Sequence, residues 1–128
     1  MAGSGRPRVD RTRGSRIAAP YPIEYVVAVA TILLSDSFRR WLADLRDHRA
    51  KARIAARIRA AGLGNFGDVK PVGDGVFEMR IAYGPGYRLY YVRRGEVTYL
   101  LLNGGEKSSQ DRDIQKAKVL AKHLDGIA

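Results

Sequence analysis

Arginine, tyrosine and lysine side chains alternate with apolar ones across residues 76–110, VFEMRIAYGPGYRLYYVRRGEVTYLLLNGGEKSSQ. Successive side chains of a β-strand point to opposite faces, so this alternation predicts a sheet with one buried face and one polar face. Cationic side chains stabilise negative charge on phosphate oxygens, and the planar fork of arginine can hold two such oxygens. The segment is therefore suited to holding a polyanionic backbone and stabilising charge at a phosphate.

A hairpin is expected to gather these cations. The sequence Gly84-Pro85-Gly86 predicts the connecting loop, and a three-residue loop places Arg80 opposite Tyr90. In this register Arg80, Arg88 and Tyr90 share one face, and a slip of one residue would disperse them. The alternative for the two arginines is pairing with Glu78 or another carboxylate.

Lys107 is expected to stand beside this face. The apolar run over residues 96–103 predicts a central strand that is buried on both sides. Gly104-Gly105 is expected to break that strand, and the polar residues 106–110 then display Lys107 just beyond its end. Lys107 therefore joins Arg80, Arg88 and Tyr90 as a candidate site residue.

Helices and further strands must position this sheet. The sequence predicts a β-branched strand over residues 23–34, helices over 36–45 and 47–61, short strands over 68–72 and 76–82, and a closing helix over 109–126. Phe38, Trp41 and Leu42 recur at helical spacing, so Trp41 is read as a core residue. This order predicts an α+β domain, with an antiparallel sheet of four to five strands and all helices on one sheet face.

Composition favours a polyanionic partner. The 128 residues carry a net charge of +10, and only five of the 23 Lys and Arg residues lie among the first twenty positions. Most of the basic charge therefore belongs to residues 21–128, which we expect to form the domain. Residues 1–20 predict a disordered Arg/Gly-rich tail. The alternative is a basic surface that only confers solubility.

Several classes of protein fit the sequence poorly. The chain has no cysteine, which excludes a disulfide framework and a thiolate metal site, and both His48 and His123 lie among charged residues. The longest apolar run, residues 26–34, is much shorter than the roughly 20 residues that span a bilayer. We expect a cytoplasmic protein without a membrane segment.

Three segments, GNFGDVK, YGPGYR and GGEKSSQ, resemble those of the RelE/HigB-like toxins of bacterial type II toxin–antitoxin modules. The resemblance covers about residues 36–125 and is greatest to the phage-derived addiction module killer protein branch. It implies a small RelE-like fold that cleaves messenger RNA on the ribosome without a cofactor or metal. It also implies a cognate helix-turn-helix antitoxin that neutralises the toxin.

The resemblance also assigns residues. Arg88 matches the strand arginine of the family and is expected to stabilise the scissile phosphate, while Arg80 and Lys107 fall where basic active-site residues occur. Lys70 matches the branch pattern and would bind RNA or phosphate. The RelE closing-helix tyrosine is missing, because no tyrosine follows Tyr99. Tyr90, or a lysine among neighbouring cations, would then have to assist proton transfer.

Two other functions remain open at this point. ParE-like toxins share the scaffold but act on DNA gyrase, so the chain could be a gyrase inhibitor. It could also be a noncatalytic basic module that only binds its antitoxin.

Overall fold

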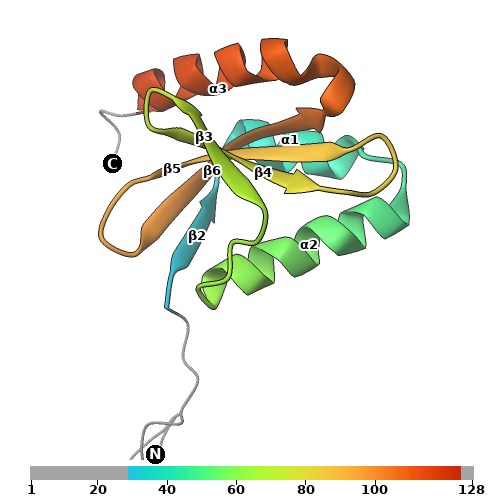
Figure 1. Cartoon of the computed structure of the whole chain (residues 1–128), viewed down its shortest axis with the longest axis horizontal. Helices are drawn as coiled ribbons and strands as arrows, with labels where there is room; N and C mark the ends of the chain where they lie inside the picture. Colours follow the sequence, from blue (N-terminus) through green and yellow to red (C-terminus); the bar gives the residue numbers. More distant parts are fainter. Residues whose placement is uncertain (1–28, 125–128) are drawn as a thin grey trace, which may run out of the picture.

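The computed structural model describes residues 29–124, which form five strands and three α-helices (Figure 1). In chain order the elements are β2 (Thr31–Leu34), α1 (Asp36–Asp44), α2 (His48–Gly62), β3 (Val69–Gly73), β4 (Val76–Ile81), β5 (Tyr87–Arg93), β6 (Thr98–Glu106), a 3-10 turn (Lys107–Ser109) and α3 (Gln110–Leu124). The predicted tail over residues 1–20, and the first half of the strand predicted over 23–34, lie outside the described residues.

Local signals explain where the first two helices begin. The Ser35 side chain accepts a hydrogen bond from the Phe38 backbone N–H, and Asp47 accepts from the N–H groups of Arg49 and Ala50. Both residues therefore satisfy donors that a helix start leaves without a partner. Phe38 and Ile54 of these helices are fully buried, and Trp41 packs against the same core, as its spacing predicted.

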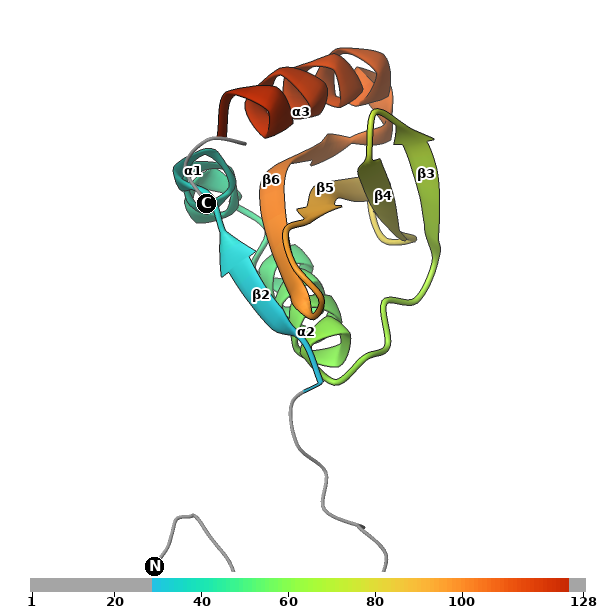
Figure 2. The same ribbon diagram turned by 90° about the vertical axis from the view of Figure 1, so that its left-hand side faces the viewer.

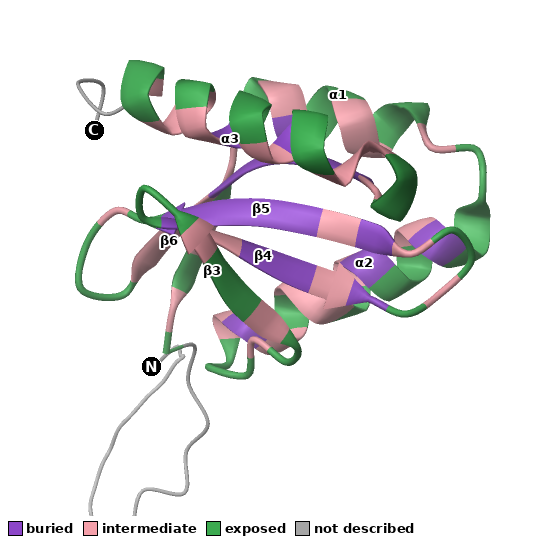
Figure 3. Ribbon diagram, turned by 45° about the horizontal axis from the view of Figure 1, so that its top comes forward, coloured by how far each residue is buried: buried purple, intermediate pink, exposed green. Residues whose placement is uncertain are grey.

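The strands form one mixed sheet in the order β2-β6-β5-β4-β3. β2 runs parallel to β6, so the prediction of an antiparallel sheet was wrong for this pair, whereas the other neighbours are antiparallel. β6 has a neighbour on each side, as a central strand would, but it spans Thr98–Glu106 rather than residues 96–103, is only half-buried at its start, and leaves β5 as the middle strand. β5 is almost entirely buried, whereas the edge strand β3 is mostly exposed (Figure 3).

Helices cover both faces of this sheet, so the prediction of all helices on one face was wrong (Figure 2). Met79, Leu89 and Leu101 pack with α1 and α2, and we call this side the α1/α2 face. Tyr90 and Leu102 pack with α3 through Ala117, and we call this side the α3 face. The strands supply apolar side chains to both faces, and helices pack against each of them.

Gly104 and Gly105 do not end the strand, contrary to the sequence prediction, because β6 continues to Glu106. A Cβ on Gly104 would meet the Trp41 ring of α1, and a Cβ on Gly105 would meet the Asp113 carboxylate of α3. The two consecutive glycines point to opposite faces. Each therefore lets a helix come close to β6 from its own side.

The β4–β5 register is shifted by two residues from the predicted one. Arg80 pairs with Arg88 and Ile81 with Tyr87, so the connecting loop spans residues 82–86 rather than 84–86. A shift of two residues keeps every side chain on its original face, because the pleat repeats every two residues. Arg80, Arg88 and Tyr90 consequently share one face, the α3 face, as predicted.

Replacing Gly105 with alanine should destabilise the fold by about 1–3 kcal/mol, because the new methyl group collides with the Asp113 carboxylate. The matched control is Gly95→Ala, whose Cβ would lie 3.7 Å from the Thr98 Cβ, an ordinary contact. Its stability should stay within about 0.5 kcal/mol of the wild type. Urea unfolding of the three proteins measures both changes, and equal stability of the two variants would refute the packing role of Gly105.

Candidate phosphate-binding site

Lys70, Arg80 and Arg88 lie in two neighbouring rows across the α3 face. Arg80 and Arg88 are direct partners on β4 and β5, and Gly105 of β6 extends this row. The next row contains Lys70, Glu78 and Tyr90 on β3, β4 and β5. The sheet therefore brings together residues that are up to 35 positions apart in the chain. Placing two arginines directly opposite each other is unfavourable unless other charges compensate.

A fully buried carboxylate compensates one of these arginines. Glu78 is 0% exposed, and its Oε2 lies 3.8 Å from Nε of Arg88, whose side chain is 12% exposed. The same oxygen accepts hydrogen bonds from the Tyr90 hydroxyl at 3.2 Å and from the Gln110 side-chain amide at 2.8 Å. Gln110 is the first residue of α3, so this helix completes the surroundings of Glu78.

Arg80 pairs with an exposed carboxylate instead. Its guanidinium donates a 2.8 Å hydrogen bond to Asp68, and both side chains are at least one-third exposed. This hydrogen bond is the main cause that lowers the pKa of Asp68, and it also raises the pKa of Arg80. An ion pair in this exposed setting is screened by water and contributes little to stability. Arg80 can therefore exchange Asp68 for another anion.

Lys107 directly follows the end of β6 and lies beside the hairpin loop. Its backbone N–H donates to the Gly86 carbonyl at 2.8 Å, which ties the end of β6 to that loop. A Cβ on Gly86 would lie 3.4 Å from the Lys107 Cβ and 3.6 Å from a terminal guanidinium nitrogen of Arg88. Gly86, with φ of 81°, thus lies between the two cationic residues. Lys107 itself is exposed.

The remaining two predicted residues differ in exposure. Lys70 is exposed on the edge strand β3 and is the strand partner of Glu78. Tyr90 is 0% exposed, and burial is the main cause that raises its pKa, followed by the neighbouring Glu78. The tyrosine hydroxyl therefore stays protonated and donates to Glu78. In this arrangement Tyr90 supports the carboxylate and is not placed to contact a substrate, because the sheet and α3 enclose it.

Sequence reasoning assigned no role to Asp68 or Gln110 and considered Glu78 only as a possible ion-pair partner. One signal was available for Glu78, because it stands two residues before Arg80 on the strand and so shares its face. No comparable signal identified Gln110, which reaches Glu78 only because α3 crosses back over β4 and β5.

The arginines of α2, at positions 49, 53 and 57, do not form a free phosphate-binding stripe. Arg57 donates to the backbone carbonyls of Arg80 at 2.6 Å and Phe66 at 3.0 Å, and burial lowers its pKa. Arg53 lies 4.5 Å from the centre of the Tyr83 ring. These contacts fasten α2 to the loops on either side of β3 and β4, so two of the three arginines stabilise the fold.

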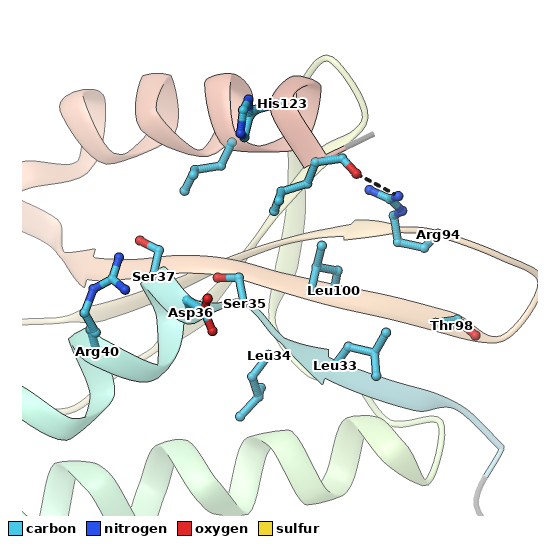
Figure 4. Close-up of a pocket in the computed structure, with 12 residues that line it drawn as sticks. Leu33, Leu34, Ser35, Asp36, Ser37, Arg40, Arg94, Thr98, Leu100 and His123 are labelled. Carbon is cyan, nitrogen blue, oxygen red and sulfur yellow. Dashed lines mark hydrogen bonds between the residues drawn. The ribbon is translucent and has the colours of Figure 1, made fainter. Parts of the chain in front are cut away.

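A separate groove of about 810 Å³ opens where β2, the start of α1 and the end of α3 meet (Figure 4). Its walls include the aliphatic side chains of Leu33, Leu100 and Leu120, and polar groups such as Arg40 and His123 lie at its rim. None of the candidate phosphate-binding residues lines it. The groove is thus a different surface from the two cationic rows.

Residues 29–124 contain no group of three or more His, Asp or Glu side chains arranged to hold a metal ion. Within the same range, no helix is long and apolar enough to cross a membrane.

The Asp68–Arg80 pair leads to a prediction for the pKa of the Asp68 carboxyl group. The carboxyl pKa of Asp68 should lie below its ordinary value and should rise when Arg80→Gln removes the donor. Because the folded-state pKa is lowered, the pair stabilises the fold above the unfolded-state pKa of about 3.9, and this effect is lost as pH falls through the folded value. Carbon-13 NMR of the carboxyl group measures the midpoint, with Arg39→Gln as a control on α1. Identical midpoints with and without Arg80 would contradict the assignment.

Comparisons with known proteins give relatives in sequence and in structure. No family model matches the chain. The structure is similar to a chain from the crystal structure of the toxin-antitoxin complex RelBE2 (Rv2865-2866) from Mycobacterium tuberculosis. That similarity has a TM-score of 0.44 and 28% sequence identity, and it covers 63% of this chain and 100% of the other. An uncharacterized protein of Haemophilus influenzae (strain ATCC 51907 / DSM 11121 / KW20 / Rd) is 50% identical over 98 residues, which cover 77% of this chain and 96% of that protein. At this identity and coverage, the chain belongs to the same protein family as the Haemophilus influenzae protein.

Proposed function

We propose that this protein is the toxin of a type II toxin–antitoxin module and acts as a metal-independent, ribosome-dependent mRNA endonuclease. The proposal rests on the resemblance of three segments to RelE/HigB-like toxins of the addiction module killer protein branch. The observation that carries it is the pair Arg80 and Arg88, which face each other across β4 and β5 with Lys107 at the adjoining strand end. Such a concentration of positive charge fits a phosphate backbone.

Each cation has a role that follows from its surroundings. Metal-free RNA cleavage builds negative charge on the scissile phosphate, which preorganised cations stabilise. Arg88, held between Glu78 and the Gly86 loop, is the group that stabilises this charge. Arg80 binds an adjoining phosphate after exchanging Asp68, and Lys70 extends the track along β3. Lys107, as an exposed cation at the adjoining strand end, binds phosphate and stabilises its negative charge.

The proposal also includes a partner that neutralises the protein and the site in the cell where the protein acts. A cognate helix-turn-helix antitoxin neutralises the toxin, and the substrate is mRNA bound to the ribosome. Both require a cytoplasmic protein. The cofactor-free mechanism follows from the resemblance, in which side-chain cations rather than a metal carry the charge stabilisation.

Lys107→Ala should weaken binding to single-stranded RNA without affecting the fold, because the side chain is exposed. Loss of one phosphate contact should reduce the slope of log affinity against log salt by about 0.7. Arg59→Ala is the matched control, since Arg59 is an exposed cation on α2, which packs on the opposite sheet face. Binding titrations at several salt concentrations measure both variants, and equal slopes would remove Lys107 from the site.

Arg88→Lys should reduce RNA cleavage roughly tenfold, about 1.4 kcal/mol of transition-state stabilisation, because lysine lacks the bidentate fork. Lysine keeps a positive charge opposite Glu78, whereas Arg88→Ala would leave that buried carboxylate without its ion-pair partner and destabilise the protein. The conservative variant therefore separates catalysis from folding. A thermal melt confirms the fold, and full cleavage by a folded Arg88→Lys variant would exclude the bidentate role.

Expression of the full chain in growing cells distinguishes the endonuclease from the two alternative functions. New RNA 5′ ends inside coding sequences, found by end mapping, are the expected result. Gyrase-dependent DNA breaks without RNA cleavage would instead identify a ParE-like gyrase inhibitor. Unaffected growth together with retained antitoxin binding would identify a noncatalytic module. Either of these outcomes rejects the endonuclease.

A further inference from the structure

We propose that Glu78 is a positioning residue, which orients Arg88 so that the terminal nitrogens of its guanidinium group face the Gly86 loop and an incoming phosphate. This inference rests on the proposed function and adds a residue to the site. Glu78 is fully buried, so it does not contact substrate in this arrangement and acts through Arg88.

The burial of Glu78 is the first argument. An ionised carboxylate taken out of water is costly unless it is paired and hydrogen-bonded. Its two hydrogen-bond donors, Tyr90 and Gln110, are both neutral, and Arg88 is its one ion-pair partner among residues 29–124. Arg88 is therefore the cation that pairs with this carboxylate, while Arg80 interacts with Glu78 at longer range.

The orientation of the guanidinium group is the second argument. Nε of Arg88 faces Glu78 at 3.8 Å, while a terminal nitrogen lies close to Gly86, beside Lys107. The planar group is thus held at one edge by the carboxylate. An arginine that is fixed before binding loses less conformational freedom when a phosphate arrives. Within residues 29–124, neither of the buried atoms Arg88 Nε and Glu78 Oε1 has a hydrogen-bond partner, so the 3.8 Å contact joins the two groups as an ion pair and not as a hydrogen bond.

The third argument is how Glu78 itself is held. The Tyr90 hydroxyl and the Gln110 amide donate to the same oxygen, Oε2, which faces Arg88. Tyr90 belongs to the sheet and Gln110 to the first turn of α3, so two separate elements fix the carboxylate. A functional group that is held by two separate elements stays within a narrow range of geometry.

The positioning role and the net charge predict opposite changes in RNA affinity when the Glu78 carboxylate is removed. Removing a carboxylate from a basic protein should, by charge alone, strengthen its binding to RNA. Loss of positioning weakens binding instead. Glu78→Gln should therefore lower affinity for a single-stranded RNA oligonucleotide about tenfold, although the protein becomes more positive. Glutamine retains an oxygen that accepts from Tyr90 and Gln110, so the fold is preserved.

Asp68→Asn is the matched control. It removes the exposed carboxylate that pairs with Arg80, and Arg80 stands in the row next to that of Glu78. Asp68 forms an ion pair with Arg80 but does not orient a buried group. This variant should therefore bind the same oligonucleotide as tightly as the wild type or more tightly. Opposite responses of the two carboxylates support the positioning role. Stronger binding by both variants would overturn it, since charge alone would then explain them.

Two further measurements connect Glu78 to Arg88 directly. In the Arg88→Lys background, Glu78→Gln should cause little additional loss of affinity, whereas an equal loss in both backgrounds would overturn the proposal. Nitrogen-15 relaxation of the Arg88 Nε–H group in the RNA-free protein should show greater motion in Glu78→Gln, and unchanged motion would also overturn it. This measurement needs no RNA. If the folded wild type binds no RNA, the proposed function fails while the relaxation data still decide whether Glu78 orients Arg88.

Discussion

The close approach of two helices to one strand is the constraint on which the arrangement depends. Gly104 and Gly105 of β6 point to opposite faces, and the Trp41 ring and the Asp113 carboxylate occupy the space that side chains would fill. Asp113 also accepts a 2.5 Å hydrogen bond from Ser109, and its backbone carbonyl accepts from the Asn103 side chain at 3.1 Å. These contacts place the start of α3 against the sheet, and that placement brings Gln110 to Glu78.

The candidate site thus combines two kinds of ion pair with different physical consequences. Glu78 and Arg88 are shielded from water, so their attraction is strong and breaking the pair by removing one partner is costly. Asp68 and Arg80 are exposed, so water and salt weaken their attraction. One arginine is consequently held in place while its neighbour is free to exchange partners. This contrast suits a surface that must fix one phosphate and accommodate the chain on either side of it.

Burial also changes the role of the aromatic residue nearest to this site. Tyr90 looked available from its position on the polar face of a strand. The α3 face is covered over β5, however, and a protonated Tyr90 hydroxyl stabilises Glu78 instead of reacting. On α2, Arg57 likewise serves the fold, because it donates to the backbone carbonyls of Arg80 and Phe66. Basic and aromatic residues in this fold therefore divide between holding the sheet and offering charge.

The sequence by itself determined the types and order of the described helices and strands and the shared face of Arg80, Arg88 and Tyr90. These features follow from local periodicity, and even a register error of two residues leaves the faces unchanged. Only the tertiary structure decided that α3 covers the opposite face from α1 and α2, that β6 runs through Gly104 and Gly105, and that Glu78 is buried against Arg88 and Gln110. These features depend on contacts between segments far apart in the chain. Alternation shows that a strand has two faces, but it does not show which helix will cover each face.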